Sequence, residues 1–262
     1  MIIDSHLHFP ELKEGKTFED SRIRLLQDMK QDKIDYAILI PDTGSSPIGD
    51  LDTALKLTES DKQLFLLGAI NILRDKPSIL QKLDDLFHSK RIIGMKIYPG
   101  CEPFYPTDKR LTSVYNLCIK YDSPIVIHTG ISPKKPQMAR YNDPKHIVKI
   151  ANKFPQLKIV IAHYFWPQVK YCYEVAKPFR NVYFDTSALA CDEVVKTTGM
   201  ANIRDVLTQS INDTPDNVLF GSDYDLGDFT KHISLIESLS LSKEQKRKVF
   251  YMNAKRLFKL QV

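Results

Sequence analysis

The chain has 262 residues, of which 43% are hydrophobic and 26% charged, a balance typical of a globular protein with a sizeable core. The net charge of +5 comes from 37 basic and 32 acidic side chains scattered along the chain, an excess too small to require nucleic acid or an anionic membrane as partner. No apolar stretch is long enough to cross a bilayer, and because the first residues already have the character of a strand we expect no secretory signal. The four cysteines are far apart, as in reduced intracellular thiols, so we expect a cytoplasmic location.

Eight apolar runs of strand length recur along the chain, separated by amphipathic stretches. The runs at 37–40 and 159–162 are apolar without alternation, as expected for parallel strands covered by helices. Their regular spacing predicts one α/β domain over residues 1–262, a (β/α)8 TIM barrel. An open doubly wound sheet is the alternative, but no G-x-G-x-x-G follows the first strand. The expected strands lie near Ile2–His6, Tyr36–Ile40, Leu64–Ile70, Ile92–Ile97, Pro124–His128, Lys158–His163, Val182–Thr186 and Val218–Gly221.

Helical periodicity fills the segments between the strands. Apolar residues fall on one face over Phe18–Met29 and over Ile79–Leu86, and an additional C-terminal helix over Lys243–Leu260 is expected to pack against the barrel. The longest connections follow strands, at 99–108, 130–143 and 224–229. In a barrel these connections lie on the C-terminal face, where active sites are built.

Polar side chains of metal-binding or proton-transferring types follow several of these strands. His6 and His8 have the i, i+2 spacing that points both imidazoles to one face of a strand, an arrangement that suits a divalent metal. Because strand ends ring one mouth, these side chains are expected to converge with four more: Lys96, His128, His163 and Asp223. The other histidines, His88, His146 and His232, fall on expected helices and are interpreted as solvated.

The order of these motifs resembles the amidohydrolase superfamily over nearly the whole chain, and most of all the branch that includes aminocarboxymuconate-semialdehyde decarboxylase. The motifs that carry the resemblance are His6-Leu7-His8, Gly94-Met95-Lys96-Ile97-Tyr98-Pro99, Pro124-Ile125-Val126-Ile127-His128-Thr129-Gly130, Ala162-His163, Gly221-Ser222-Asp223-Tyr224 and Asn253-Ala254-Lys255-Arg256-Leu257-Phe258. One departure is that Asp225, followed by Asp228, stands where relatives often have proline. This departure suggests a strand-eight loop shaped for different substrate groups.

The resemblance implies a divalent metal, zinc first and manganese as the alternative, with one ion favoured over two. The ligands that match the mononuclear members are His6, His8, His128 and Asp223. His163 matches a histidine that is a catalytic acid/base in mononuclear members and a second-metal ligand in binuclear ones. Lys96 stands where binuclear members place a carboxylated, bridging lysine, and it is otherwise expected to meet a substrate anion.

The chemistry expected from these residues is hydrolysis of a small ester, lactone or amide that carries a carboxylate, through a metal-activated water. Asp223 is the expected general base, and His163 is expected to stabilise the oxyanion or protonate the leaving group. The basic residues Lys134, Lys135 and Arg140 are candidate clamps for the anion, and Tyr98 and Trp166 are candidate walls of the substrate site.

Three other functions remain open from the sequence. The same site suits a non-oxidative decarboxylase of an unsaturated or aromatic acid. A nuclease is disfavoured because a lysine rather than a glutamate follows strand four and no basic stripe interleaves with aromatics. A non-catalytic barrel is disfavoured because every candidate ligand is kept. The expected partner is therefore a small-molecule substrate, without nucleic acid or membrane, and a homo-oligomer is compatible with the sequence.

Overall fold

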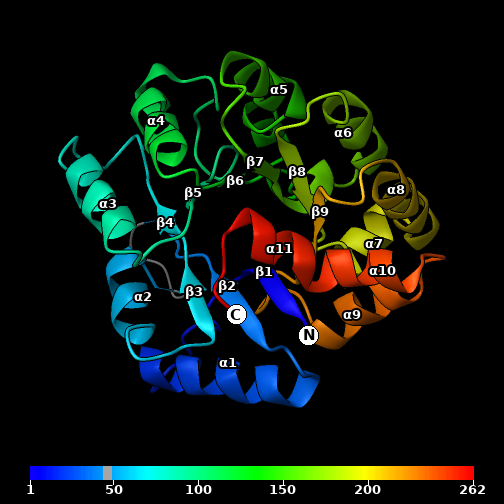
Figure 1. Ribbon diagram of the computed structural model, residues 1–262, viewed down its shortest axis with the longest axis horizontal. Coiled ribbons are helices and arrows are strands. Elements are labelled where there is room, and N and C mark those ends of the chain that lie inside the picture. The colour runs from blue at the N-terminus through cyan, green and yellow to red at the C-terminus, as the bar shows by residue number, and fades with distance from the viewer. Residues whose placement is uncertain (44–48) are drawn as a thin grey trace.

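The chain forms a closed parallel barrel ringed by helices, seen down its axis in the computed structural model, which describes residues 1–43 and 49–262 (Figure 1). The strands are short and the ladders between them are parallel throughout. Their bounds are β1 Ile3–Leu7, β2 Tyr36–Leu39, β3 Leu64–Leu66, β4 Gly68–Ala69, β5 Met95–Ile97, β6 Ile125–Ile127, β7 Ile159–Ile161, β8 Val182–Asp185 and β9 Val218–Leu219.

Two seams close the barrel. At one seam the expected strand over 64–70 changes its partner, because the Leu67 amide donates to Leu39 O at 3.0 Å and the Gly68 amide donates to Gly94 O at 2.9 Å. β3 and β4 are therefore two halves of one barrel strand, and the eight expected strands are confirmed. At the other seam the Ser5 amide donates to Phe220 O at 2.9 Å and the Asp223 amide to His6 O at 2.8 Å, which joins β1 to the segment after β9.

The outer ring consists of helices at the positions that the periodicity predicts. The Thr17 side chain and Asp20 form a capping box that begins α1. The expected C-terminal helix is one helical segment that a π-helical turn over Lys248–Met252 divides into α10 and α11. The helix bounds are α1 Phe18–Asp32, α2 Leu51–Leu57, α3 Ile79–His88, α4 Thr112–Lys120, α5 Pro144–Lys153, α6 Val169–Ala176, α7 Asp192–Thr198, α8 Met200–Asp213, α9 Phe229–Glu237, α10 Lys243–Arg247 and α11 Asn253–Leu257.

Alternate strand residues divide between two apolar clusters, one outside the barrel and one inside it. The outer cluster packs strand residues such as Ile125 and Ile159 against the helices. The inner cluster contains Val126 and Val160, which occupy the positions between them, together with residues of α11. Because α11 lies across the barrel in Figure 1, it covers the end opposite the strands' carboxyl ends.

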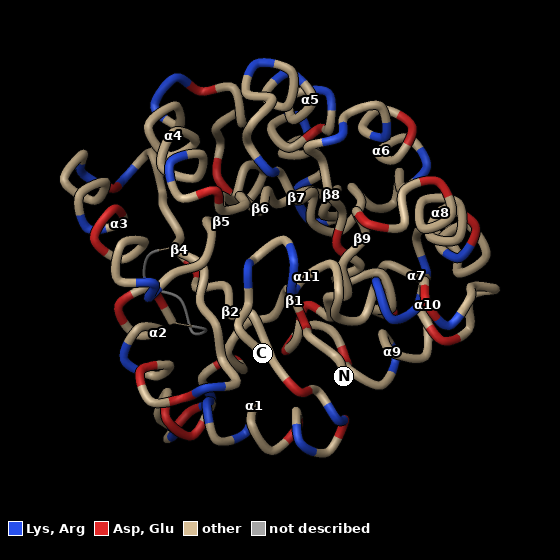
Figure 2. The backbone as a smooth tube through the Cα atoms, in the orientation of Figure 1, with Lys and Arg blue, Asp and Glu red and all other residues tan. Residues whose placement is uncertain are grey.

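Charged residues of both signs are interspersed around the ring of helices rather than gathered on one side (Figure 2). None of the helices formed by residues 1–43 and 49–262 has the length and apolar character needed to cross a membrane. The four cysteines are free thiols, as expected from their spacing.

Candidate metal centre

His6 and His8 present the same ring nitrogen to the barrel mouth. His6 Nδ1 lies 2.8 Å from Asp185 Oδ2, and His8 Nδ1 lies 2.8 Å from the Ile40 carbonyl oxygen. A carbonyl oxygen and an ionised carboxylate only accept hydrogen bonds, so each Nδ1 carries the proton and each Nε2 keeps its lone pair. Burial lowers the pKa of His6 to about 3, so its imidazole is neutral.

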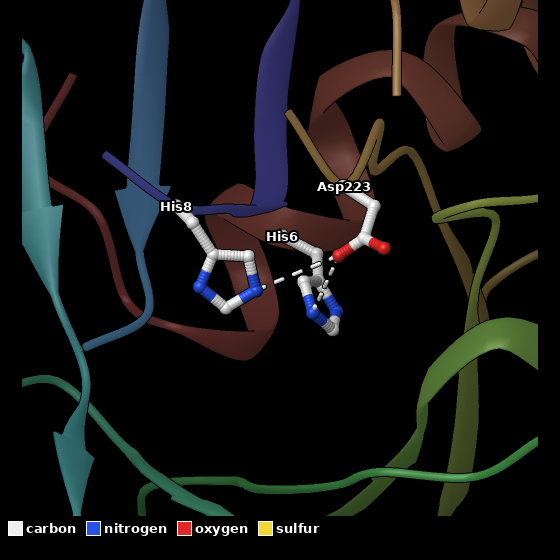
Figure 3. A group of neighbouring side chains, drawn as sticks. All are labelled: His6, His8 and Asp223. Carbon is white, nitrogen blue, oxygen red and sulfur yellow. Dashed lines mark ion pairs between the residues drawn. The ribbon is translucent and has the colours of Figure 1, made fainter. Parts of the chain in front are cut away.

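The Asp223 carboxylate meets these two lone pairs. Asp223 Oδ1 lies 3.5 Å from His6 Nε2 and 3.5 Å from His8 Nε2, as the dashed lines of Figure 3 mark. Because both rings present lone pairs to it, the carboxylate gains no hydrogen bond from either Nε2 atom.

The three acceptor atoms have no proton of their own to share. They lie within 4.8 Å of one another, and two imidazole nitrogens with one carboxylate oxygen are a donor set that zinc and related cations bind. The residues present therefore fit a divalent metal at this position.

His128 and His163 lie at the same mouth, outside this compact group. The His163 ring centroid is 4.7 Å from that of His6 and 5.0 Å from that of His128. Loss of contact with water lowers the pKa of both imidazoles. The structure thus brings together the residues expected at the ends of strands one, five, six and eight. His128 contacts His163, and His163 in turn contacts His6.

Lys96 points into the barrel and contacts a candidate ligand. Its Nζ lies 3.0 Å from His6 Nε2 and 5.0 Å from the centre of the Tyr98 ring. Among the described residues, it is the one lysine or arginine with a fully buried side chain. Burial lowers the pKa of Lys96 to about 8 against the opposing pull of Asp185 and Asp223. In this arrangement the Lys96 ammonium donates to the His6 lone pair.

The expected substrate-binding residues divide into two groups. Tyr98 is buried beneath Lys96 with its hydroxyl donating to Pro41 O at 2.8 Å, and Trp166 packs on Gly130, two residues beyond His128. Arg140 is exposed instead, and its guanidinium stacks on Tyr141 at 4.7 Å. The loop residues Lys134 and Lys135 are also exposed.

Two residues at the end of β8 were missed by the sequence reasoning. Asp185 is buried and accepts from His6 Nδ1, and it also receives the His163 amide at 3.2 Å and the Ser187 hydroxyl. Asp185 and His163 form a second close group with His6, but there hydrogen bonds already join the polar atoms. The signal available in the sequence was position, because Asp185 ends a strand as the other site residues do.

Asp4 is a further buried carboxylate that the sequence reasoning passed over. Asp4 Oδ1 accepts from the amides of His6 at 3.0 Å and Ser222 at 3.2 Å, and so ties β1 to the segment that carries Asp223. Asp4 Oδ2 is buried without a hydrogen-bond partner among the described residues. Burial raises the pKa of Asp4 to about 7.

One histidine interpretation was wrong. His232 is not solvated but 1% exposed, because α9 packs it against the segment after β8, where its Nε2 accepts from the Ala190 amide at 3.1 Å. Its Nδ1 donates to Asp228 O at 2.8 Å, one turn back along the helix. His88 is exposed as expected, and His146 is half-buried against the Tyr105 ring.

The two carboxylates that depart from the family pattern have local partners. Asp225 accepts from Arg24 Nη2 of α1 at 2.9 Å, and Asp228 caps the N-terminus of α9 through the Lys231 amide. These contacts give each carboxylate a structural role in holding the loop.

Site residues also have unusual backbone angles. His163 and Asp223 have φ values of 64° and 63°, in the left-handed region that disfavours residues with a side chain. Tyr164 and Phe165 continue the left-handed turn after β7 with φ values of 50° and 53°. Such strain persists where the surrounding structure holds it, commonly at functional sites.

The profile of the amidohydrolase family matches residues 3–260. A TIM-barrel protein from Bordetella bronchiseptica, described as uncharacterised, is 19% identical with a TM-score of 0.78 and 98% of each chain covered. A probable 2-pyrone-4,6-dicarboxylic acid hydrolase from Acinetobacter baumannii, solved with citric acid, is 12% identical with a TM-score of 0.70 and 99% of each chain covered.

A 5-carboxyvanillate decarboxylase from Novosphingobium aromaticivorans was solved with manganese and 4-hydroxy-3-methoxy-5-nitrobenzoic acid. It is 17% identical with a TM-score of 0.66, over 90% of this chain and 80% of that chain. No curated protein matches this chain in sequence. The similar structures share the fold, and the family profile spans the strands that supply every candidate ligand. The chain therefore belongs to the amidohydrolase family.

Proposed function

We propose that this amidohydrolase is a metal-dependent hydrolase that opens a small ester, lactone or amide bearing a carboxylate. The observation that carries the proposal is the convergence of His6 Nε2, His8 Nε2 and Asp223 Oδ1, three acceptors with no proton between them. These residues would hold a divalent metal, which would lower the pKa of a bound water from about 15.7 towards about 7.

The choice of metal follows from the donor set. Zinc is proposed first because imidazole nitrogen suits it, and manganese is the alternative, since the similar decarboxylase was solved with manganese. One ion is favoured over two because the compact acceptor group has three members. His128 is the proposed fourth ligand.

The residues around the metal position divide the remaining work. Asp223 is ionised and takes up the proton of the attacking water as general base. Lys96 gives up its hydrogen bond when His6 Nε2 binds a cation, and its ammonium is then available to a substrate carboxylate. Tyr98 and Trp166 are the proposed walls of the substrate site, and His163 is the proposed second acid/base group.

A non-oxidative decarboxylase is the second candidate function. The fold similarity to the 5-carboxyvanillate decarboxylase supports it, and so does the buried ammonium of Lys96, which suits a substrate whose reacting group is itself a carboxylate. In this alternative His163 would deliver a proton to the substrate carbon that loses carbon dioxide.

Metal content is the first test. Protein purified without chelator is expected to contain close to one equivalent of zinc or manganese by elemental analysis. Less than a small fraction of an equivalent, with no uptake of added zinc or manganese, would contradict the metal site. The loaded protein is then assayed in parallel for opening of carboxylated lactones, esters and amides and for carbon dioxide release from unsaturated and aromatic acids. Release of carbon dioxide alone would replace the hydrolase by the decarboxylase.

The role of Asp223 is tested with a matched pair from one loop. Asp223→Asn is expected to retain metal while losing roughly 100-fold or more in turnover, the size of a general-base contribution. Asp228→Asn is the control, because asparagine caps a helix as well as aspartate does and turnover should be unchanged. Equal turnover in Asp223→Asn and wild type, at equal metal content, would remove Asp223 from the role of base.

A further inference from the structure

A buried hydroxyl connects two imidazoles of the site. Ser187 is 0% exposed, and its Oγ lies 2.8 Å from His163 Nδ1 and 3.2 Å from His6 Nδ1. The same oxygen is hydrogen-bonded to Asp185 Oδ1, and Asp185 Oδ2 accepts from His6 Nδ1 at 2.8 Å. Asp185, Ser187, His6 and His163 therefore form one closed network beneath the metal position.

Counting protons in this network fixes who donates to whom. Asp185 accepts through both carboxylate oxygens: Oδ1 meets the backbone amides of His163 at 3.2 Å and Ser187 at 3.1 Å, which can only donate, and Oδ2 meets His6 Nδ1. The single hydroxyl proton of Ser187 points to Asp185, and the Nδ1 proton of His6 does the same. Ser187 Oγ has lone pairs left and no second proton.

His163 Nδ1 must then be the donor of the remaining hydrogen bond. If it were unprotonated, its lone pair would face the Ser187 Oγ lone pair at 2.8 Å and the Ser187 carbonyl oxygen at 3.4 Å, with no hydrogen between them. An unsatisfied pair of buried acceptors is costly. A neutral imidazole has one ring proton, and this hydrogen bond places it on Nδ1 of His163.

We propose that Ser187 is a positioning residue that relays the orientation of Asp185 to His163, holding it as the Nδ1–H tautomer with an unprotonated Nε2. His163 therefore starts the reaction cycle as a lone-pair donor, able to accept a proton or bind a cation, and can donate a proton from Nε2 only after taking one up. The role of His163 in the reaction cycle rests on the proposed function, whereas its tautomer does not.

The tautomer is read directly by two-bond 1H–15N correlation spectra of protein labelled with 15N-histidine, with the His163 signals assigned by their loss in His163→Gln. In the wild type, the His163 protons are expected to show a protonated Nδ1 and an unprotonated Nε2. An Nε2–H tautomer of His163 in the wild type would overturn the proposal without recourse to any further variant.

Removal of the hydroxyl tests the relay. Ser187→Ala is expected to move the His163 tautomer ratio about tenfold towards Nε2–H, the weight of one hydrogen bond. Ser210→Ala is the matched control, since it removes an equally buried hydroxyl that bonds to Tyr164 OH at 2.9 Å and touches no imidazole. An unchanged His163 ratio in folded Ser187→Ala, or the same change in Ser210→Ala, would refute the relay.

A second variant covers the case in which Ser187→Ala does not fold. Ser187→Cys nearly keeps the side-chain volume but has a weak donor and a weak acceptor, so it should move the His163 tautomer ratio in the same direction, and no movement would count against the relay. The metal assay runs on the same samples. If the protein binds no metal but the His163 tautomer ratio changes in the Ser187 variants, the proposed function is refuted and the relay is supported. If the protein binds metal and is active but the ratio does not change, the proposed function is supported and the relay is refuted.

Discussion

The two ends of the barrel interior are built from the same strands and follow different rules. Towards the end covered by α11, the inward positions are apolar, and Val126 and Val160 pack with Leu257 and Phe258 of that helix. Towards the carboxyl ends of the strands, the inward positions are polar, and the side chains are His6, Lys96, His128 and Asp185. Lys96 and Val126 are neighbours in strand register, so the change occurs between adjacent strands.

The difference shows where the fold gains stability and where it gives some up. The apolar end needs only side chains of suitable volume, and their burial is favourable by itself. At the polar end each buried group needs a partner, and two features there are unfavourable: the unpartnered Asp4 Oδ2 and the left-handed backbone of His163 and Asp223. Functional sites commonly carry such a cost.

A charge placed at the apolar end should break the fold. Val160→Asp is expected to lower the free energy of unfolding by at least about 4 kcal/mol, because its partners in strand register are Val126 and Tyr183 and neither can neutralise a carboxylate. Val160→Ala, which removes volume without adding charge, should cost about 2 kcal/mol. Denaturant titration measures both, and similar losses in the two variants would mean that the apolar end tolerates polarity as the other end does.

The buried Asp4 predicts a dependence of stability on pH. Its pKa of about 7 in the folded protein lies above the ordinary 3.8, so folding takes up a proton between these values and stability falls as pH rises. Between about pH 4.5 and about pH 8 the metal-free wild type should lose about 3 kcal/mol that Asp4→Asn does not lose. Denaturant titration of both proteins at the two pH values measures this loss. The same difference in unfolding free energy at both pH values would mean that Asp4 is solvated or paired.

Two buried histidines, His8 after β1 and His232 on α9, distinguish metal binding from burial alone. His8→Ala removes a candidate ligand and should weaken zinc or manganese binding by at least about 100-fold, somewhat under 3 kcal/mol. His232→Ala removes a buried histidine that bonds to Ala190 and Asp228, so it should lower stability and leave metal affinity unchanged. Calorimetric titration distinguishes them, and equal affinities in both variants would argue against His8 as a ligand.

The pH dependence of stability that comes from Lys96 should be the smallest effect, and its sign is opposite to that of Asp4. Its pKa of about 8 in the folded protein lies below the ordinary 10.5, so folding releases a proton and stability rises between these values. From about pH 8 to about pH 9.5 the metal-free wild type should gain about 2 kcal/mol relative to Lys96→Met, whose side chain cannot titrate. A constant difference between the two curves would place the Lys96 ammonium in contact with water.

Much of this molecule could be predicted from its sequence. Runs such as 159–162 marked the strands because burial on both faces requires continuous apolar residues, and spacing marked the helices between them. The position of a polar residue at a strand end then placed His6, His163 and Asp223 at one mouth, because parallel strands of a barrel end together. These are local or periodic properties, which a single sequence displays.

Contacts between distant segments were decided by the tertiary structure alone. The lone pairs of His6 and His8 face Asp223 because Asp185 and the Ile40 carbonyl hold the opposite nitrogens, and Asp185 lies 179 residues from His6. His232 was misjudged because its burial depends on what α9 packs against. Hydrogen bonds of side chains have no period in sequence, so only the closed barrel could set the direction of each proton at the site.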